Sequence, residues 1–535
     1  MNFKAIIISI ALSLFSTIVM SYVSLATPIG PWIAPTLVFI ALLMSKCVVN
    51  ITSKYMAYVV SAGSVGGILA TACAFSFPTI YFLDSGLFNE WMSSPLFFCG
   101  MLGSFSFLAG MFGILIADIS EKFLIDTQQL VFPVGQLVYK MIAAQDQIRK
   151  AYELMIGFII ATVFSLLQGG LFLTRSIIPK SVTLLPKLPF LIFSVPRVVI
   201  NVDIAPMIWA IGFVTGHVIA LPLAVGALSN IILLNPMQQL LFPYLSSTEF
   251  TLAFCSGIVL FITIISIVGL PKQIFNGIKN NIAKVTHSKS VVSNLFCARD
   301  FLCALCVMIG LIAFLSHFKF AWYVQLYLIV CSAVTTYQIA AIAGRIGLAL
   351  LGRFATFVMV PAMFIFNLNY VHMVFIATFV EIAGGVAADI LFGRKLAQLS
   401  DISRTTVRRY QILGLVIASV SIGIIFWLLI NHFGLGSPEL FAYRAQSRQL
   451  LIQTKHFDYI VLACGALFGF CLQKIHLNPM LVLGGLLMPF DITLGLVAGG
   501  LLAAVSANKE DWYPFWSGIF ASSSLCMLLR AIGNF

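Results

Sequence analysis

Long apolar segments follow one another along nearly the whole 535-residue chain, and they restrict it to one class of fold. A helix needs about 20 apolar residues to cross a bilayer, where the backbone must satisfy its own hydrogen bonds. Charged residues make up 9% of the chain, against about 25% in soluble domains. The basic residues lie in short connections, so the net charge of +12 indicates membrane orientation and not nucleic-acid binding. The sequence predicts an all-α polytopic protein in a lipid bilayer.

We expect about sixteen transmembrane helices, with about 20 residues for each. Their expected ranges are 5–26, 29–49, 57–83, 95–117, 130–144, 152–174, 204–234, 251–270, 300–317, 321–343, 345–367, 371–392, 410–431, 457–473, 476–505 and 513–532. The helix count stays open around 130–144, 204–234 and 432–456. The chain then divides into a first half, 1–270, a basic linker loop, 271–299, and a second half, 300–535.

The distribution of charge predicts the orientation. Loop 84–94 has two acids and no Lys or Arg, whereas loops 175–203, 271–299 and 393–409 are basic. The positive-inside rule places the basic loops and the N-terminus in the cytoplasm. Ser24-Leu25-Ala26 is a poor cleavage site, so we expect an uncleaved first span. The basic loop 432–456 disagrees, so either a span is miscounted or the outer face attracts an anion.

Short motifs recur in the same order in both halves, so we expect two related halves of about eight spans each. The segment 212–228 is similar to 469–486, with Pro222 opposite Pro479. Two further Gly-rich segments correspond, 61–82 and 342–366, and we expect helix breaks at Gly66 and Gly67 in the first of them and at Pro479. An even number of spans per half relates the halves by an axis along the membrane normal.

Two acids interrupt an otherwise apolar segment, VFIATFVEIAGGVAADILFGRK, at 374–395. A carboxylate in hydrocarbon costs several kcal/mol, so it is rarely retained without a function. Glu381 and Asp389 are eight residues apart, and Gly384 and Gly385 between them allow a close helix contact or a helix break. We interpret the segment as a solute or proton pathway. The alternative is that one or both acids reach water near a helix end.

Further candidates lie in the two unusual spans. Pro133 and Gly135 open the short span 130–144 and suit an interrupted helix, with Lys140 inside it and Glu153 just beyond. These two charges either pair or reach the membrane surface separately.

The long span 204–234 contains Gly216 and Pro222, which indicates a broken helix. Asp203 precedes it, and His217 within it is either a group that titrates during transport or a hydrogen-bonded core residue.

Basic residues and cysteines complete the candidates. Arg345 and Lys395 either bind an anionic solute or neutralise the acids of 374–395. Cys303 and Cys306 have a metal-like spacing, but their apolar setting favours buried, inert thiols. The sequence contains no phosphate-binding loop and no HExxH motif, so we expect no metal, no cofactor and no ATP hydrolysis.

Four segments together resemble the oligopeptide transporter (OPT) superfamily, and the chain is similar to its bacterial members. FPVGQLVYKMIAA resembles the family's FPxG segment, and IGFVTGHVIALPLAVGALSNIILLNP its Gly-rich span ending in Pro. VEIAGGVAADILFGRKLAQLSDISRTTVRRYQILG resembles the block in which Asp389 and Lys395 fall on the family's Asp and Lys. LNPMLVLGGLLMPFDITLGLVAGGLL resembles the C-terminal block.

The resemblance implies about sixteen spans, a cytoplasmic N-terminus and proton-coupled uptake of peptides or metal chelates. Lys140 stands where the family has an acid, Leu396 replaces the Gly after the block's Lys, and the NPGPF motif is missing. We therefore expect a secondary active importer of small oligopeptides or of metal-chelate, siderophore-like solutes. The alternative is a membrane-embedded enzyme or assembly scaffold without solute flux. Whether the protein forms a homodimer is left open.

Overall fold

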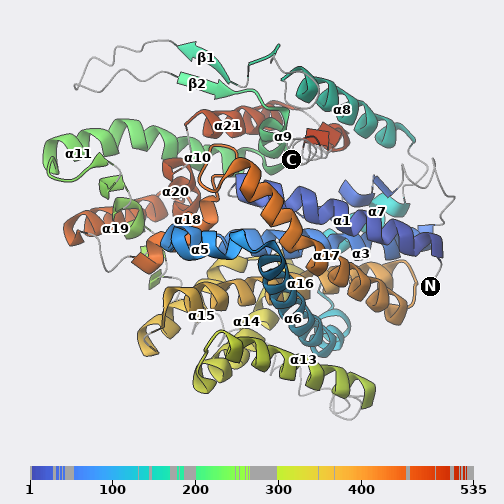
Figure 1. Ribbon diagram of the computed structural model, residues 1–535. Helices are drawn as coiled ribbons and strands as arrows, with labels where there is room; N and C mark the ends of the chain where they lie inside the picture. Colours follow the sequence, from blue (N-terminus) through green and yellow to red (C-terminus); the bar gives the residue numbers. More distant parts are fainter. Residues whose placement is uncertain are drawn as a thin grey trace. The chain divides into compact units, whose positions relative to one another are not determined.

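The computed structural model builds the described chain from helices and one pair of short strands (Figure 1). It describes residues 3–27, 32–34, 36–38, 40–41, 53–130, 132–143, 148–168, 177–179, 181–185, 200–247, 249–251, 253–258, 261–262, 264–265, 298–346, 349–366, 368–453, 458–487, 490–506, 511–516, 518–519, 522–523 and 526. Loop 271–297 and most of the expected spans 29–49 and 513–532 therefore lie outside the described residues.

Seven of the described helices are long and apolar enough to cross a membrane. They are Phe3–Ala26, Tyr55–Leu83, Pro95–Thr127, Ala220–Leu241, Trp322–Gly344, Tyr370–Leu399 and Arg404–Phe433. The prediction of a multi-pass helical membrane protein is confirmed, while the count of about sixteen spans stays a prediction.

The chain divides into two compact units. Unit 1 comprises residues 1–17, 54–140 and 263–424, and unit 2 comprises 18–53, 141–262 and 425–535. Each unit takes segments from both halves of the sequence, and the division into related halves stays a prediction.

The helices begin and end as follows. From the N-terminus to residue 143 they are α1 (Phe3–Ala26), α3 (Ser53–Ser76), α4 (Thr79–Leu83), α5 (Ser85–Ser93), α6 (Pro95–Glu121), the π-helix η1 (Lys122–Thr127) and α7 (Pro133–Ala143). Unit 1 also contains α13 (Ala298–His317), α14 (Trp322–Ile346), α15 (Leu351–Ile365), α16 (Tyr370–Leu399) and most of α17 (Arg404–Phe433).

Unit 2 contains the remaining elements. They are α8 (Ile148–Leu167), β1 (Ser181–Leu185), β2 (Ile200–Asp203), α9 (Pro206–Thr215), α10 (His217–Ser229), η2 (Asn230–Leu234), α11 (Asn235–Leu241), α18 (Tyr443–Gln453), α19 (Tyr459–Lys474), α20 (Pro479–Leu487) and α21 (Phe490–Val505).

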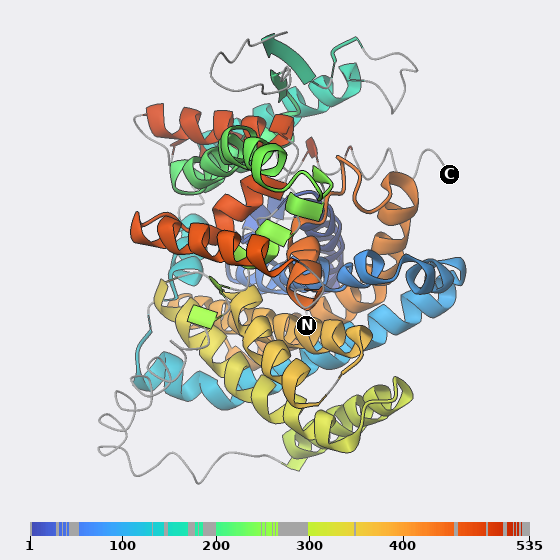
Figure 2. The same ribbon diagram turned by 90° about the vertical axis from the view of Figure 1, so that its left-hand side faces the viewer.

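Helix α16 forms the core of unit 1. Every residue from Met373 to Arg394 is buried, and α4, α6, α14 and α15 pack around it (Figures 1 and 2). Its first turn is capped by Asn369, whose side chain accepts a hydrogen bond from the backbone of Tyr370 at 2.8 Å. A helix that is apolar on every side is typical of a central position, so the sequence of α16 itself accounts for its burial.

Glycines let the helices of unit 1 approach closely. Gly113 of α6 lies directly against the backbone carbonyl of Ala383 on α16, where an added Cβ would collide. Gly414 of α17 lies in the same way against Ala62 of α3. Small residues at crossings are the usual means by which membrane helices pack, because lipid supplies no hydrophobic driving force between them.

We expect Gly113→Ala to lower the melting temperature, with a cost of about 1–3 kcal/mol typical of overpacking. Gly100→Ala on the same helix is the control, because a Cβ there would meet nothing within 4 Å. Alanine favours a helix over glycine by about 1 kcal/mol, so the control should be neutral or stabilising. Thermal unfolding of both variants in one detergent checks this, and equal shifts would contradict the close contact.

Unit 2 contains three reciprocal glycine contacts. Gly212 of α9 and Gly499 of α21 each lie against a backbone carbonyl of the other's helix, and Gly226 of α10 and Gly485 of α20 do the same. Gly257 and Gly465 form the third pair. The paired helices therefore cross almost backbone to backbone, which fixes their spacing without large side chains.

Three local features of the structure differ from the sequence expectation. The basic loop 175–203 contains an antiparallel strand pair in which Ser181 faces Asp203 across the ladder, so the all-α prediction is incomplete. The strands are rich in β-branched residues, which suit this conformation. Residues 443–453 of the expected loop 432–456 form α18. Cys306 is exposed, because it lies on the outer face of α13, and its expected burial is wrong.

Asp84 caps α5 and also contacts α16. Its carboxylate accepts a hydrogen bond from the backbone of Leu87 at 2.9 Å, and the Tyr370 hydroxyl donates a second one. These two bonds, the backbone bond foremost, lower the pKa of the Asp84 carboxyl. The charged form of Asp84 is therefore favoured in the folded protein.

The lowered pKa predicts a pH-dependent effect of Asp84→Asn. Stabilisation by the charged form is present above the unfolded pKa of about 3.9 and is lost as the pH falls through the folded pKa. Wild type should melt at a higher temperature than Asp84→Asn at neutral pH. The two melting curves should converge below about pH 4, and a constant offset down to acid pH would contradict the assignment.

Candidate functional site

Asp389 is the most deeply placed candidate of the sequence analysis. Its side chain is 1% exposed on α16, and Ser64 of α3 donates a hydrogen bond to Oδ2 at 2.8 Å. The other oxygen, Oδ1, is buried without a hydrogen-bond partner among the described residues. A buried carboxylate that is satisfied on one side only is costly, and a proton or another positive charge at Oδ1 removes that cost.

Glu381 occupies a second position on the same contact between α3 and α16. It is 0% exposed, and the Ser76 hydroxyl of α3 donates to its Oε2. Because Ser64 meets Asp389 and Ser76 meets Glu381, α3 and α16 run antiparallel here. Each acid lies about three turns from the nearer end of α16, so water at a helix end does not account for them.

Helices continue through four of the predicted helix breaks, and three of these glycines, Gly66, Gly384 and Gly385, lie at close contacts. Helix α3 continues through Gly66 and Gly67, and α16 continues through Gly384 and Gly385. A Cβ at Gly384 would collide with Ile339 of α14, and one at Gly66 would lie 2.6 Å from a backbone carbonyl of α1. Gly66, Gly384 and Gly385 therefore serve helix contact, the first of the two roles that the sequence allowed for the Gly384–Gly385 pair.

The other predicted breaks lie at or near helix ends, with one exception. Pro133 and Pro479 are the first residues of α7 and α20. Gly216 separates α9 from α10 with φ of 75°, a conformation that glycine adopts without strain. Pro222 lies inside α10, which continues through it. The discontinuity in the range 204–234 therefore lies at Gly216.

The FPVG segment packs onto the C-terminal part of α16. Phe132 has a positive φ of 49°, its backbone N–H donates to the Gly344 carbonyl at 2.8 Å, and its ring lies 5.7 Å from that of Phe392. An added Cβ at Gly135 would lie 2.8 Å from the Phe392 carbonyl and 3.6 Å from Lys395 Cβ. Gly135 and Lys395, predicted separately, are thus neighbours one to two turns from Asp389.

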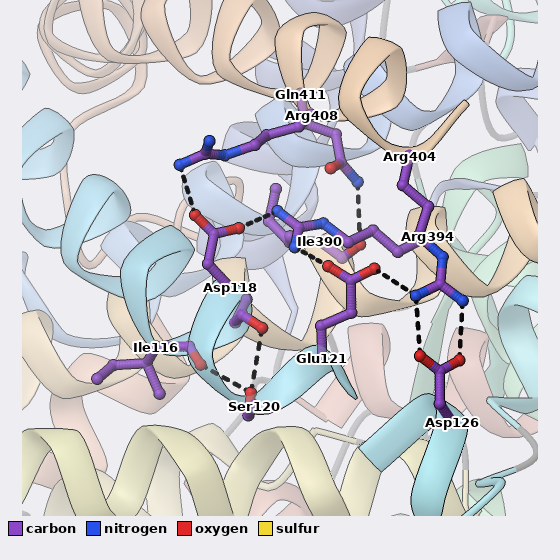
Figure 3. Close-up of polar contacts among 11 residues, drawn as sticks. Ile116, Asp118, Ser120, Glu121, Asp126, Ile390, Arg394, Arg404, Arg408 and Gln411 are labelled. Carbon is purple, nitrogen blue, oxygen red and sulfur yellow. Dashed lines mark hydrogen bonds and ion pairs between the residues drawn. The ribbon is translucent and has the colours of Figure 1, made fainter. Parts of the chain in front are cut away.

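Arg394 begins a network of ion pairs where α6 ends (Figure 3). Its side chain is 3% exposed, and its two terminal nitrogens bind Asp118 and Glu121 of α6. A guanidinium with two separate carboxylates uses the forked geometry that lysine lacks. The positive charge of Arg394 is therefore neutralised by α6.

Two arginines of α17 extend the network. Arg408 pairs with Asp118 at 2.7 Å, and Arg404 pairs with Asp126 at 2.8 Å and with Glu121 at 3.3 Å (Figure 3). The arginines that the sequence assigned to a basic cytoplasmic loop are thus matched by carboxylates. The network joins α6, η1, α16 and α17.

Among the described side chains, none of the remaining candidate residues of the sequence analysis joins Asp389 and Glu381 at α16. The side chains of Lys140, Asp203, His217 and Arg345 lie outside the described residues. Glu153 is half-buried on α8, in unit 2. Lys395 is half-buried and its Nζ donates to Gln398 at 2.9 Å. In the described part of the chain, no group of three or more His, Cys, Asp or Glu side chains could hold a metal ion.

The sequence analysis missed the partners of the charged residues on α16. Asp118 and Glu121 are three residues apart at the end of an apolar span, and this spacing on one helix face is a usable signal for an arginine partner. Ser64 and Ser76 carry no such signal, because serines are common in membrane helices and their partners lie on a distant segment.

Acids buried in the central helix of a multi-pass membrane protein are typical of solute transporters. The chain belongs to the OPT family: the model of the OPT oligopeptide transporter protein matches residues 1–523. No curated protein matches the chain. The predicted OPT membership is confirmed, and the members of this family are transporters.

Proposed function

We propose that the protein is a secondary active, proton-coupled importer of small oligopeptides or of metal-chelate, siderophore-like solutes. The observation that supports this best is the pair of carboxyls on α16, at 0% and 1% exposure, each of which accepts a hydrogen bond from a serine of α3. A group of this kind can take up a proton in one conformation and release it in another. No phosphate-binding loop is present in the sequence, so an ion gradient is the energy source we assign.

Asp389 carries the coupling role in this proposal, with Glu381 in a supporting one. The neighbouring segments that contain Gly135 and Lys395 form the part of the pathway that contacts the solute. Peptides and metal chelates of the carboxylate type both present carboxylate groups, which a lysine or arginine can bind.

Two experiments test transport and identify the solute. Purified protein is screened for thermal stabilisation by di- to hexapeptides and ferric chelates, because a solute that binds the folded state raises its melting temperature. The best solute is then followed into proteoliposomes with and without an inward proton gradient. Gradient-dependent uptake supports the importer. Turnover of the solute in detergent without flux would favour the membrane-embedded enzyme instead.

The proposed orientation has a cytoplasmic N-terminus in the inner membrane. In unit 1, Glu90 precedes the start of α6 and Thr405 adjoins the ion-pair network at its end, so the length of α6, about 40 Å, separates them. In a cysteine-free background, an impermeant maleimide should label Glu90→Cys from outside intact cells and Thr405→Cys only after permeabilisation. Labelling in the reverse order would invert the topology.

A further inference from the structure

We propose that Asp389 of α16, Ser61 of α3 and Gln411 of α17 form a binding site for a dehydrated sodium ion. The three residues are 1%, 2% and 0% exposed. Asp389 Oδ1, Ser61 Oγ and Gln411 Oε1 are all buried without a hydrogen-bond partner among the residues that the structure describes. Buried polar atoms are nearly always paired, so three such oxygens on three packed helices indicate a common ligand.

The side chains of Ser61 and Gln411 meet beside Gly393, one turn beyond Asp389 on α16. A Cβ at Gly393 would lie 3.0 Å from Ser61 Oγ and would collide with the Gln411 amide. Ser64, one turn from Ser61 on the same face of α3, donates to Asp389 at 2.8 Å. The glycine thus allows groups from α3 and α17 to reach α16 within one turn of the Asp389 carboxylate.

Asp389, Ser61 and Gln411 have too few hydrogen-bond donors for their three unpartnered oxygens to satisfy one another. The Gln411 amide nitrogen donates to the Ile390 carbonyl at 3.0 Å, so its oxygen is the acceptor left over (Figure 3). A carboxylate oxygen and an amide oxygen accept only, and a serine hydroxyl has one hydrogen to give. The three oxygens therefore have a single hydrogen among them, whereas a cation could be bound by all three.

Charge and size select the ion. One carboxylate balances one positive charge, and a buried divalent ion would leave a charge uncompensated. Arg394 does not provide the positive charge that balances Asp389, because its guanidinium binds Asp118 and Glu121. Oxygen-only ligands favour hard ions over transition metals. A Cβ at Gly393 would already meet both Gln411 and Ser61, so we assign the smaller of the two common monovalent ions, Na⁺ rather than K⁺.

The inference deepens the proposed function, because it gives the transport carboxylate a second cation that competes with the proton. The proposed sodium site can be wrong while the proposed transport function is right, since the site is tested by ion binding to the purified protein. A sodium response without solute uptake would support the sodium site and contradict the proposed importer. Solute uptake without any sodium response would support the importer and contradict the sodium site.

The test measures the melting temperature of the purified full-length protein as Na⁺ replaces choline at constant ionic strength and constant, mildly alkaline pH. We expect a saturable rise with Na⁺ that an equal concentration of K⁺ does not produce. At ten times its Kd, Na⁺ should favour the folded state by about tenfold. Equal effects of Na⁺, K⁺ and choline would overturn the proposal.

Variants assign the response to the three ligands. Ser61→Ala and Gln411→Leu should each raise the Kd for Na⁺ by about tenfold, the order expected when one ligand of a charged group is lost. Asp389→Asn should abolish the response, and if it does not fold the other two variants decide. The matched control is Ser332→Ala on α14, whose buried hydroxyl also has no partner in the described structure. A sodium response that survives in Ser61→Ala and Gln411→Leu, or that is lost equally in Ser332→Ala, would refute the site.

Discussion

Asp389→Asn is expected to abolish gradient-driven uptake while leaving the protein folded and inserted. The amide oxygen can still accept the Ser64 hydrogen bond that Asp389 accepts at 2.8 Å, so the contact of α3 with α16 should persist. The amide cannot exchange a proton, and we expect uptake to fall by at least about 100-fold, as when an essential proton-transfer group is removed. The measurement is initial uptake into proteoliposomes of the solute found by the stabilisation screen.

Two acid-to-amide variants accompany this test. Glu381→Gln should weaken uptake or shift its pH optimum without abolishing it, because the second carboxyl remains. Asp84→Asn changes an acid of the same unit that lies outside the membrane-spanning helices, and its uptake should match wild type. Expression and melting temperature are measured on the same samples, since acids that only hold helices together would lower stability first.

The contrary result is well defined. If Asp389→Asn is stable and transports at the wild-type rate from about pH 5 to pH 8, where histidine titrates, the coupling residue lies elsewhere. The region of Asp203 and His217 is then the next to be tested.

Arg394→Leu is expected to be the most destabilising single change in the ion-pair network. Arg394 is 3% exposed and pairs with two carboxylates, Asp118 at 22% and Glu121 at 13% exposure. Removing one partner of a buried pair leaves uncompensated charge and typically costs about 3–5 kcal/mol. Arg404→Leu removes a residue that is 38% exposed, where solvent screening limits the cost to about 1 kcal/mol.

Thermal unfolding of both variants in one detergent compares these costs. The double variant Arg394→Leu with Glu121→Gln should recover part of the loss, because it removes the excess negative charge while Asp118 keeps Arg408 and Asp126 keeps Arg404. Arg394→Lys should stay impaired, since a single ammonium cannot bind both carboxylates with a fork. Equal melting temperatures for Arg394→Leu and Arg404→Leu would show that burial does not govern this network.

The sequence predicted the helical membrane fold and the central carboxyls because these depend on local composition. An apolar segment with acids in its middle is visible in any window that contains Glu381 and Asp389. The proline and glycine that start or separate helices, such as Pro133 and Gly216, are also local signals.

The partners of these residues were not predictable in the same way. Ser64 and Asp389 are separated by 325 residues, and Arg394 and Glu121 by 273. Positive-inside counting treats Arg394, Arg404 and Arg408 as free positive charges, and it has no means of assigning them to acids on another helix. Likewise, no local pattern tells whether Gly384 opens its own helix or admits Ile339 from a neighbour.

The ion-pair network also sets an order of events during synthesis of the protein. The segment with Asp118 and Glu121 leaves the ribosome 273 residues before Arg394, which at about 5–20 residues per second is an interval of roughly 15–55 s. Throughout this interval the two acids lack the arginine that neutralises them, and hydration at the membrane surface must stabilise them instead. Their position at the very end of α6 makes this possible. Unit 1 therefore completes its packing only after most of the chain has been made.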